Sequence, residues 1–449
     1  MSHYKPYPAY KDSGVKWLGR VPEHWDTQRI RSLIDSAQNG IWGDDPDGGV
    51  DDIPCARVAD FDRNSFTVKG ELPTLRKVPE AQRLSRQVNP GDLLIEKSGG
   101  GEQTTVGVVV QYQGVEPVIC SNFVAVVKPK KGVFPRWLCY SNAHLYSVGV
   151  NVRSIKQTTG IQNIDSDQYF SERVAVPPES ERQAISAHLD RETARIDALI
   201  EKKTRFIELL REKRQALITH AVTKGLDPNV KMKDSGVEWL GEVPEHWAVC
   251  KLSFRYSVEL GKMLDEKRIT STSLMPYLRN QDVQWDAVNA EDLPEMDIHP
   301  DELSRYTVRA GDLLVCEGGD VGRAAIWRGE NEVIGYQKAL HRLRPRDATA
   351  DTVEFFFFTL MAAKTRGVFE ESDSKATIAH LPAEKFRQYR FAFPPVHEQR
   401  EIAGHIRTLA QRLDQVQLKT ERSIELLKER RSALITAAVT GQIDLREAV

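Results

Sequence analysis

The chain has 449 residues, of which 40% are hydrophobic and 28% charged, and its formal net charge at pH 7 is −2. This length predicts two or three domains, and the composition is typical of a globular protein and excludes a disordered one. Because the net charge is near zero, overall charge does not favour nucleic acid or a membrane surface as a partner, although basic residues clustered on one face would still allow DNA binding.

Cysteine usage and the N-terminus indicate where the protein works. The five cysteines are scattered without a CxxC pair, a pattern that argues against a disulfide framework and a structural zinc site and fits a reducing compartment. The first residues, MSHYKPYPAYKDSG, lack the apolar core of a signal peptide, and the longest apolar run, near residues 355–363, is too short to span a membrane. We therefore expect a soluble cytoplasmic protein.

The chain contains an internal duplication. KDSGVKWLGRVPEHW at residues 11–25 returns as KDSGVEWLGEVPEHW at residues 233–247 with thirteen of fifteen positions identical, and we call these two stretches the tryptophan segments. Further along each copy, IELLREKRQALITHAVT at 207–223 matches IELLKERRSALITAAVT at 424–440 at thirteen of seventeen positions. Two halves that share their ends but differ in between predict one kind of partner contacted twice and two different targets recognised.

The stretches between the shared ends predict mixed α/β domains. Short β-branched runs at residues 104–112 and 122–129, bounded by glycine and proline, are typical of strands. The segments at 135–149 and 352–367 predict helices at corresponding places in the two halves.

Each half is expected to end in a long helix. Apolar residues recur there at steps of three, four and seven, with charged residues between them, and neither proline nor glycine interrupts residues 179–223. A helix of this size is about 65 Å long, at about 1.5 Å per residue. The expected coiled-coil core residues are Ile185, Leu189, Ile196, Leu199, Phe206, Leu210 and Leu217 in the first helix, and Ile402, Ile406, Leu409, Leu413, Val416, Leu427 and Leu434 in the second.

Two arrangements of these helices are open from the sequence. Each could be an amphipathic helix that packs on its own domain. The favoured arrangement is an antiparallel coiled coil of the two helices, because helices this long and this charged need each other to bury their apolar stripes. A pseudo-twofold relation between the halves would make them antiparallel.

No catalytic motif is found in the sequence. Gly261-Lys262 is followed by Met263, where a phosphate-binding loop requires serine or threonine. His397-Glu398 begins like a zinc-protease motif, but residue 401 is glutamate where the second histidine ligand would stand. The histidines of the tryptophan segments, His24 and His246, are interpreted as packed or capping residues rather than as a catalytic pair.

DNA binding is better supported than catalysis. The candidate segments are rich in basic and amide side chains, which contact phosphates and base edges, and glycine-rich turns at 96–101 and 317–323 let the backbone approach a ligand closely. Taken singly, each segment is more often a solvated loop, and the signal is their matched placement in both halves. The candidate DNA contacts are Arg57, Lys97, Ser98, Lys128, Lys130, Lys131, Arg153, Lys156, Gln157 and Thr159 in the first half, and Arg279, Asn280, Gln281, Arg323, Lys375 and Thr377 in the second.

The chain resembles the specificity subunit of type I DNA restriction-modification enzymes over essentially its full length. The resemblance rests on the paired DSGVxWLGxVPEHW segments, the paired GDLL turns, and the starts of the two helices, PPESERQAI at 177–185 and PPVHEQREI at 394–402. The first of these helix starts departs slightly from the family pattern PPxxEQ.

The resemblance implies a fold and a domain order. The expected fold is mixed α/β, with two tandem target recognition domains separated by two long antiparallel coiled-coil helices that space the halves of a split DNA site. The expected division is residues 1–176 for the N-terminal target recognition domain, 177–223 for the first helix, 224–232 for a linker, 233–393 for the C-terminal target recognition domain, and 394–449 for the second helix and tail.

The resemblance also implies partners. Two methyltransferase subunits would bring S-adenosylmethionine, and two translocase/nuclease subunits would bring ATP and Mg²⁺, so this chain itself would be non-catalytic and bind no cofactor or metal. The residues expected to dock the methyltransferases, or alternatively to pin each tryptophan segment to its own domain, are Trp17, His24, Trp25, Trp239, His246 and Trp247. The competing hypotheses are a self-contained restriction or modification enzyme, which would methylate DNA alone, and a protein-only coiled-coil scaffold, which would show no salt-dependent DNA affinity.

Overall fold

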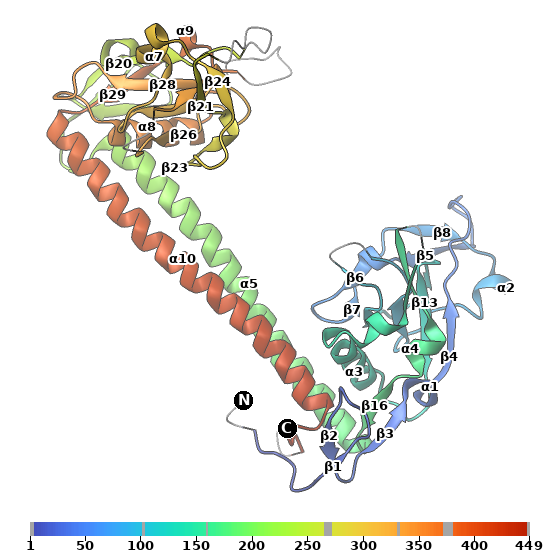
Figure 1. Cartoon of the computed structure of the whole chain (residues 1–449). Helices are drawn as coiled ribbons and strands as arrows, with labels where there is room; N and C mark the ends of the chain where they lie inside the picture. The colour runs from blue at the N-terminus through green and yellow to red at the C-terminus, as the bar shows by residue number, and fades with distance from the viewer. Residues whose placement is uncertain are drawn as a thin grey trace. The chain divides into compact units, whose positions relative to one another are not determined.

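A computed structural model describes residues 4–100, 104–158, 160–264, 272–329, 333–370 and 380–446. The chain divides into two compact units, one formed by Met1–Thr204 with Glu421–Val449 and the other by Arg205–Thr420. Each unit contains one β-rich body and a part of both long helices (Figure 1). Thr159, Lys375 and Thr377, three of the candidate DNA contacts, lie outside the described residues.

In the first unit, the tryptophan segment forms a hairpin and then leads into a strand that returns to the long helix. The hairpin consists of β1 (Tyr10–Asp12) and β2 (Arg20–Pro22), which pair antiparallel. The next strand, β3 (Asp26–Arg29), pairs antiparallel with β16 (Arg173–Val176), the last strand before the long helix. The tryptophan segment therefore lies beside the start of that helix, although more than a hundred residues separate them along the chain.

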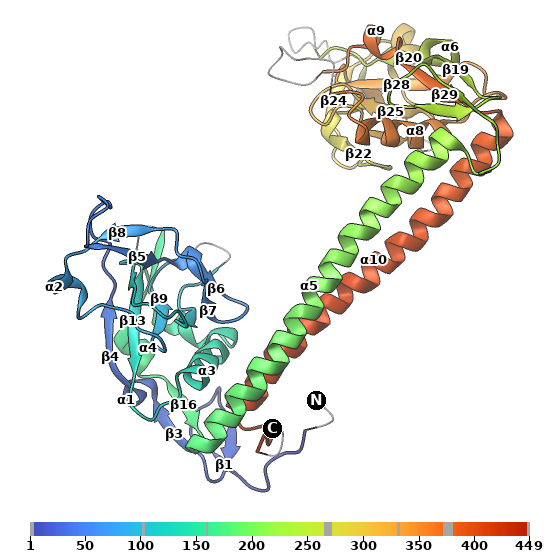
Figure 2. The ribbon, with the colours of Figure 1, turned by 180° about the vertical axis from the view of Figure 1, so that it is seen from behind.

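The body of the first unit is built on a six-stranded sheet of order β4-β13-β9-β11-β7-β6 (Figure 2). Its pairs are antiparallel except for β11 with β7, and two three-stranded sheets, β12-β5-β8 and β10-β15-β14, accompany it. The strands are β4 (Ile34–Asn39), β5 (Asp52–Ala56), β6 (Phe61–Asp62), β7 (Thr67–Val68), β8 (Leu75–Lys77), β9 (Leu93–Glu96), β10 (Ser98–Gly99), β11 (Val109–Gln111), β12 (Ile119–Cys120), β13 (Val124–Pro129), β14 (Ile155–Thr158) and β15 (Ile161–Ile164).

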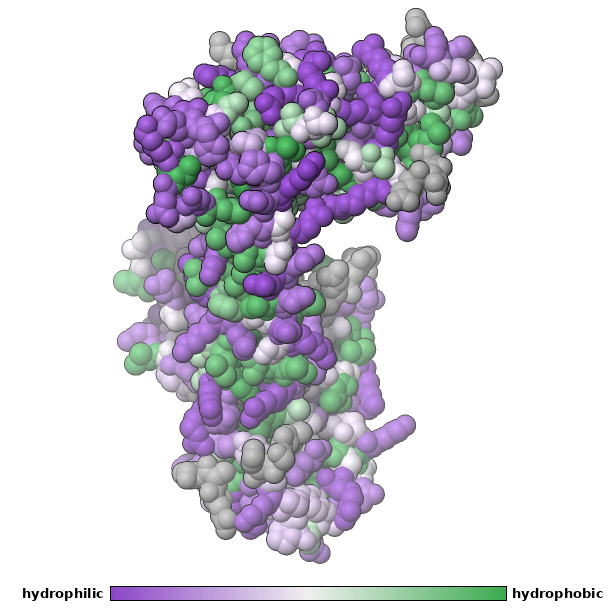
Figure 3. Space-filling view, turned by 90° about the vertical axis from the view of Figure 1, so that its left-hand side faces the viewer, coloured by the Kyte–Doolittle hydropathy of each residue, from purple (hydrophilic) through white to green (hydrophobic). Residues whose placement is uncertain are grey.

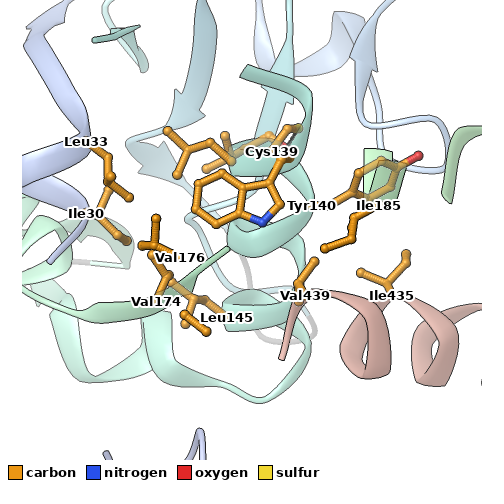
Figure 4. Packing of buried hydrophobic residues seen from close by; sticks show 14 of the residues in the cluster. Ile30, Leu33, Cys139, Tyr140, Leu145, Val174, Val176, Ile185, Ile435 and Val439 are labelled. Atoms are coloured by element: carbon orange, nitrogen blue, oxygen red, sulfur yellow. Dashed lines mark hydrogen bonds between the residues drawn. The ribbon is translucent and has the colours of Figure 1, made fainter. Parts of the chain in front are cut away.

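The core of the first unit lies between this sheet, helix α3 (Pro135–Ser147) and the long helices. Trp137 and Tyr140 of α3 are fully buried. Figure 4 shows Ile185 from the first long helix and Ile435 from the second facing this cluster. The shorter helices are α1 (Ile30–Leu33), η1 (Val58–Asp60), α2 (Glu80–Arg83), η2 (Val150–Ser154) and α4 (Ser166–Phe170).

The second unit repeats this order of elements. Its hairpin, its strand pair next to the helix, its antiparallel sheet β20-β28-β25-β26 and its sheet β24-β21-β27 correspond to β1-β2, β3-β16, β4-β13-β9-β11 and β8-β5-β12 of the first unit. The strands are β17 (Met232–Asp234), β18 (Glu242–Pro244), β19 (Ala248–Lys251), β20 (Tyr256–Leu260), β21 (Leu274–Leu278), β22 (Val283–Gln284), β23 (Ala287–Val288), β24 (Glu295–Asp297), β25 (Leu313–Cys316), β26 (Ala324–Ile326), β27 (Gly335–Tyr336), β28 (Leu340–Pro345) and β29 (Arg390–Phe393).

Helix α8 (Val353–Thr365) corresponds to α3 and forms the core of the second unit. The hydroxyl of Thr352 accepts a hydrogen bond from the backbone N–H of Phe355 and caps the helix, and Phe355, Phe356 and Phe357 are almost completely buried. The two predicted helices and the predicted strand at 122–129 are confirmed, whereas only Val109–Gln111 of the predicted strand at 104–112 forms a strand. The remaining helices are α6 (Leu252–Arg255), η4 (Asn280–Asp282), η5 (Pro300–Glu302), α7 (Leu303–Tyr306) and α9 (Ala383–Phe386).

The two long helices are α5 (Glu179–Lys224) and α10 (Val396–Val439). Each follows a Pro-Pro pair, which disfavours helix in the residue before it, and each is followed by a glycine with positive φ, Gly225 or Gly441, which suits a helix C-terminus. In the first unit Asp197 pairs with Arg431 at 3.0 Å, and in the second Arg214 lies 3.7 Å from Asp414. From the first pair to the second, the residue number rises from 197 to 214 along α5 and falls from 431 to 414 along α10, so the two helices are antiparallel.

The heptad register differs from the expected one in the middle of both helices. Ile185, Leu189, Ile196, Leu210, Ile402, Ile406 and Leu434 are buried, whereas Leu217, Leu409, Leu413 and Leu427 are half-buried. The predictions for Leu199, Phe206 and Val416 are wrong, since these side chains are 40%, 44% and 40% exposed. The residue directly after each of them, Ile200, Ile207 or Gln417, is less exposed and faces inward instead.

Polar residues explain this error. Lys203, Arg214 and Thr420 occupy inner heptad positions, so the apolar residues nearby suggest a stripe that is one residue out of phase. All five cysteines are free. Among the described residues no cluster of three or more His, Cys, Asp or Glu side chains could hold a metal ion, and no helix in that part of the chain has both the length and the apolar character of a membrane span.

Candidate nucleic-acid interface

A pocket of about 470 Å³ opens on the β-rich body of the first unit, and we call it the Trp42–Phe123 pocket. Trp42 is 39% exposed and Phe123 is 44% exposed, which is unusual for large aromatic side chains. The pocket is lined by Trp42, Arg57, Val58, Ala59, Glu96, Ser98, Gly99, Gly100, Ser121, Asn122 and Phe123. It contains Arg57 and Ser98, two candidate DNA contacts.

The glycine-rich turn after β9 shapes one wall of this pocket. The backbone carbonyl of Phe123 accepts hydrogen bonds from the N–H groups of Lys97 and Ser98, which hold the turn against the start of β13. Gly99 has φ +133° and Gly100 has φ +70°, conformations that residues with a side chain rarely adopt. The backbone here therefore requires glycine at residues 99 and 100.

Glu96 lies in the wall of the pocket with only 2% of its surface exposed. Its Oε2 accepts a hydrogen bond from Nη2 of Arg63 at 2.9 Å. Burial raises the pKa of Glu96, an effect that the nearby Arg63 charge opposes. The pocket therefore has an acceptor carboxylate in an otherwise largely apolar lining.

Arg57 and its counterpart Arg279 each bond to an aspartate of their own unit and so stabilise the local fold. The backbone N–H of Arg57 donates to Oδ2 of Asp60 at 2.8 Å, and its Nε lies 3.3 Å from the same oxygen. Arg279 makes the same two contacts with Asp282, at 2.7 and 2.8 Å. Both arginines cap a short 3-10 helix, η1 or η4, and their side chains remain partly exposed beside it.

Other candidate contacts of the first unit lie on the sheet β10-β15-β14 beside the pocket. The hydroxyl of Ser98 donates to Oδ1 of Asn163 at 2.6 Å, and Lys156 is the pairing partner of Asn163 on the next strand. Lys156 and Gln157 are exposed, and Arg153 is exposed on η2. Nζ of Lys156 pairs with Asp165 at 2.7 Å, and this hydrogen bond raises the pKa of Lys156.

The structure does not bring Lys128, Lys130 and Lys131 to this pocket. Phe123 precedes β13 and Lys130 follows it, so the two lie at opposite ends of a strand roughly 20 Å long. Lys130 and Lys131 instead line a second, polar pocket of about 420 Å³ with His24 and Arg182, next to the start of α5.

In the second unit, Asn280 and Arg323 are bonded within the chain. Nδ2 of Asn280 donates to the backbone carbonyls of Gly318 and Ala339 at 3.0 and 3.3 Å, and Nη2 of Arg323 donates to Oδ1 of Asn280 at 2.9 Å. These two side chains hold the glycine-rich turn 317–323 against the neighbouring strands. Gln281 is exposed at the same place.

The tryptophan segments are pinned to their own units. Trp25 is fully buried, and its Nε1 donates to Oε2 of Glu181 in the first turn of α5 at 2.9 Å. Trp247 is 1% exposed, and its Nε1 donates to Oε2 of Glu398 in α10 at 2.7 Å. Of the two alternatives for these indoles, their contacts match the pinning of each segment to its own domain, and neither indole is accessible as a surface anchor for a partner.

The other docking candidates differ in exposure. His24 and His246 are exposed at their ring edges and contact the same glutamates, at 2.7 and 2.9 Å. Trp17 and Trp239 are half-buried and pack against the hydrophobic cores of their own units.

Sequence reasoning included Glu96 only as the first residue of the glycine-rich turn at 96–101, and it missed Trp42 and Phe123. A lone tryptophan between two glycines, GIWG at 40–43, is the one local signal for an exposed aromatic side chain. Phe123 carries no such signal, since it meets Glu96 only through the pairing of β9 with β13. The face in Figure 3 shows how hydrophobic residues lie among hydrophilic ones on this protein's surface, so exposure alone does not mark a site.

Comparisons with known proteins agree on one family. Residues 245–427 match the family model described as the type I restriction modification DNA specificity domain. The chain is 24% identical over 371 residues to the type I restriction enzyme EcoKI specificity subunit of Escherichia coli (strain K12), covering 80% of this chain and 76% of that one. It is 22% identical to the MjaVIII specificity subunit of Methanocaldococcus jannaschii, covering 97% of both chains.

Two solved structures share the fold. One, from a study of complex assembly and conformational transition of the type I R-M system, has a TM-score of 0.70 at 15% identity and covers 93% of this chain and 98% of that chain. The other, the HsdS subunit of Thermoanaerobacter tengcongensis, has a TM-score of 0.58 at 13% identity and covers 94% and 98%. The mixed α/β fold with long helices is therefore shared with these two structures.

Proposed function

We infer that this chain, which belongs to the family of type I restriction-modification specificity subunits, recognises a split DNA site and that each unit reads one half of it. As a specificity subunit, it is the DNA-recognition component of its complex and leaves catalysis to other subunits. Its two β-rich bodies, one in each unit, would contact the two half-sites.

The observation that supports this proposal is that the two units share one arrangement of strands and helices but carry different side chains at matched positions. In both units a capping arginine, a glycine-rich turn and a sheet edge meet in the same order. The residue just before β13 in the first unit is Phe123, and the residue just before the corresponding β28 in the second unit is Ala339. The paired strand, β9 or β25, ends in Glu96 in the first unit and in Cys316 in the second. Two different surfaces on one scaffold suit two different half-sites.

We propose residues 1–176 and 233–393 as the two target recognition domains. Residues 177–223 and 394–449 would supply the helices that set the unread gap between the half-sites, with 224–232 as the linker. The antiparallel pairing of α5 with α10 inside each unit supports this division. The described helices start two residues later than proposed here, at Glu179 and Val396.

We further propose that two methyltransferase subunits dock on the two tryptophan-segment hairpins and the adjoining helix ends, and that two translocase/nuclease subunits complete the complex. The hairpins β1-β2 and β17-β18 have the same pairing register, so they offer two similar surfaces. With Trp25 and Trp247 buried, the docking contacts would come from exposed groups such as His24 and His246.

Selection from a random DNA pool by the chain co-purified with its methyltransferase tests the split site. We expect two short, unlike half-sites at a fixed gap. A single contiguous motif, or no enrichment, would overturn the proposal, and the second outcome would favour a protein-only scaffold. Insertion of one heptad into both α5 and α10 is expected to widen the gap and leave the half-sites unchanged, whereas an unchanged gap would exclude the helices as the spacer.

A further inference from the structure

The Trp42–Phe123 pocket has features that contact with the edge of a paired base does not require. Its two aromatic side chains are exposed although the pocket is concave. Arg76 holds Trp42 in place, because its guanidinium carbon lies 4.5 Å from the centre of the indole ring and its Nε donates to the carbonyl of Trp42 at 2.9 Å. A fixed, exposed aromatic surface is what an unstacked base needs to replace its lost stacking.

Glu96 gives the pocket a chemical preference. Oε2 of Glu96 accepts a hydrogen bond from Arg63. Oε1 lies near Gly99 of the pocket lining, 3.6 Å from the place where a Cβ atom on that glycine would stand. A carboxylate accepts hydrogen bonds, so it favours a base that presents an exocyclic amine and disfavours one that presents a carbonyl oxygen at the same edge. Cytosine, adenine and guanine each carry an exocyclic amine that an unstacked base can present to a carboxylate, whereas thymine has none and presents a single N–H between two carbonyl oxygens.

The burial of Glu96 decides how a base could reach it. A paired base shows only its edge, between the two backbones of the duplex, while 98% of the surface of Glu96 is shielded by its own unit. A group that bonds to this carboxylate must enter the pocket. The volume of about 470 Å³ lies within the range of roughly 300–1,000 Å³ typical of small-molecule sites and is large enough for a base.

We propose that the Trp42–Phe123 pocket receives one cytosine, adenine or guanine that has left the base stack of the half-site bound by the first unit. The base would lie against Phe123 and Trp42, and its exocyclic amine would donate a hydrogen bond to Glu96. This inference rests on the proposed function, since it names a base within the half-site of the first unit.

The second unit provides an internal control. Ala339 stands where Phe123 is, so the aromatic wall is missing at the matched place, and Cys316 stands where Glu96 is. The next residue, Glu317, is a buried carboxylate that pairs with His380, so the missing aromatic wall is the difference that decides. We therefore expect no such pocket base in the half-site of the second unit.

The test uses the complex of this chain with its methyltransferase, and duplexes in which one base at a time is left in place while its partner is replaced by a mismatch. A mismatch weakens binding at ordinary positions. At a position whose base leaves the stack, the mismatch tightens binding, by roughly tenfold, because part of the unpairing cost has already been met. We expect this tightening at one cytosine, adenine or guanine in the half-site of the first unit.

A methyltransferase also extrudes its own target base, so a variant must separate the two signals. Phe123→Ala should abolish the tightening at the pocket base and leave any tightening at the methylated base. Val115→Ala, at a side chain that is 90% exposed and outside the pocket, is the matched control and should change neither. Glu96→Gln should reduce the preference for a base with an exocyclic amine over thymine at that one position, because an amide both donates and accepts.

Specific binding without any position whose tightening depends on Phe123 would overturn the inference while leaving the proposed function intact. The proposed function fails separately, if the complex selects no split site. A tightening that depends on Phe123 but falls in the half-site of the second unit would also overturn the inference.

Discussion

Nε1 of Trp25 donates a hydrogen bond to Oε2 of Glu181 at 2.9 Å, and this bond joins the tryptophan segment to the first turn of α5. The same carboxylate accepts a hydrogen bond from the hydroxyl of Tyr7 at 2.8 Å and contacts Nε2 of His24 at 2.7 Å. Burial and the hydrogen bond to Glu181 raise the pKa of Tyr7. The most closely repeated part of the sequence therefore contains an intramolecular clamp.

We expect the two copies of this clamp to differ in strength. The side chain of Glu181 is 8% exposed, whereas that of Glu398 is 29% exposed and is hydrogen-bonded only by Trp247 and His246 among the described side chains. Glu181→Ala leaves two buried donors without an acceptor and should lower the free energy of unfolding by about 3 kcal/mol, at about 1–3 kcal/mol per buried unsatisfied group. Glu398→Ala should cost about half as much.

Urea denaturation of the two variants, monitored by tryptophan fluorescence, measures this difference. Glu179→Ala, also in the first turn of α5 but without a bond to the tryptophan segment among those described, is the matched control. Equal losses for Glu181→Ala and Glu398→Ala would contradict a role for burial in the strength of the clamp.

The corrected heptad register makes a second prediction. Leu210 is 9% exposed and Phe206 is 44% exposed on the same helix. Leu210→Ala should therefore lower the free energy of unfolding by about 2–3 kcal/mol, near the lower end of the range for a buried leucine. Phe206→Ala should change it by less than about 1 kcal/mol, as is usual at the surface. If thermal or urea denaturation showed a larger loss of stability for Phe206→Ala than for Leu210→Ala, the heptad register expected from the sequence would be correct after all.

The sequence predicted the fold through its repeats and periodicity and failed where distant strands meet. Pro-Pro pairs and the terminal glycines mark the ends of α5 and α10 in the sequence itself. Glu96 and Phe123 lie far apart along the chain and meet because β9 and β13 pair, a contact that no local pattern specifies. Lys130 failed as a neighbour of the pocket for a related reason, since a residue's place along a strand decides which end of the domain it occupies.

Two buried histidines predict how stability changes with pH. Burial lowers the pKa of His144 to about 4 and that of His341 to about 4, against an ordinary value of 6.5. Nδ1 of His144 lies 3.1 Å from the hydroxyl of Thr436, and Nε2 of His341 lies 2.7 Å from the carbonyl of Leu381. Both rings are therefore neutral in the folded protein at neutral pH.

The direction of the pH effect depends on which state binds the proton. Below about pH 6.5 the unfolded chain takes up protons on these histidines while the folded protein does not, until the pH reaches about 4. Stability should thus be full above pH 6.5 and fall as the pH drops from 6.5 to 4, by up to about 3 kcal/mol for each histidine. Urea denaturation at a series of pH values should show this slope, and His144→Gln should make it shallower. An unchanged slope in that variant would exclude His144 as a contributor.

Lys156 offers the cleanest test of the candidate phosphate contacts. Its side chain is 71% exposed, and its ion pair with Asp165 is a surface pair of the kind that contributes little to stability, so removing the lysine should leave the fold intact. If Lys156 contacts a phosphate, Lys156→Ala should make the slope of log K against log salt concentration shallower by about 0.9, and it should weaken specific and non-specific DNA alike. Lys231 is the matched control, because its side chain is 79% exposed and it also pairs with an acidic residue, Glu245, but it lies in the linker. DNA-binding isotherms of the complex at several salt concentrations decide the point. An equal change in slope for Lys156→Ala and Lys231→Ala would indicate a general effect of net charge, whereas a change for Lys156→Ala alone would place a DNA phosphate at β14.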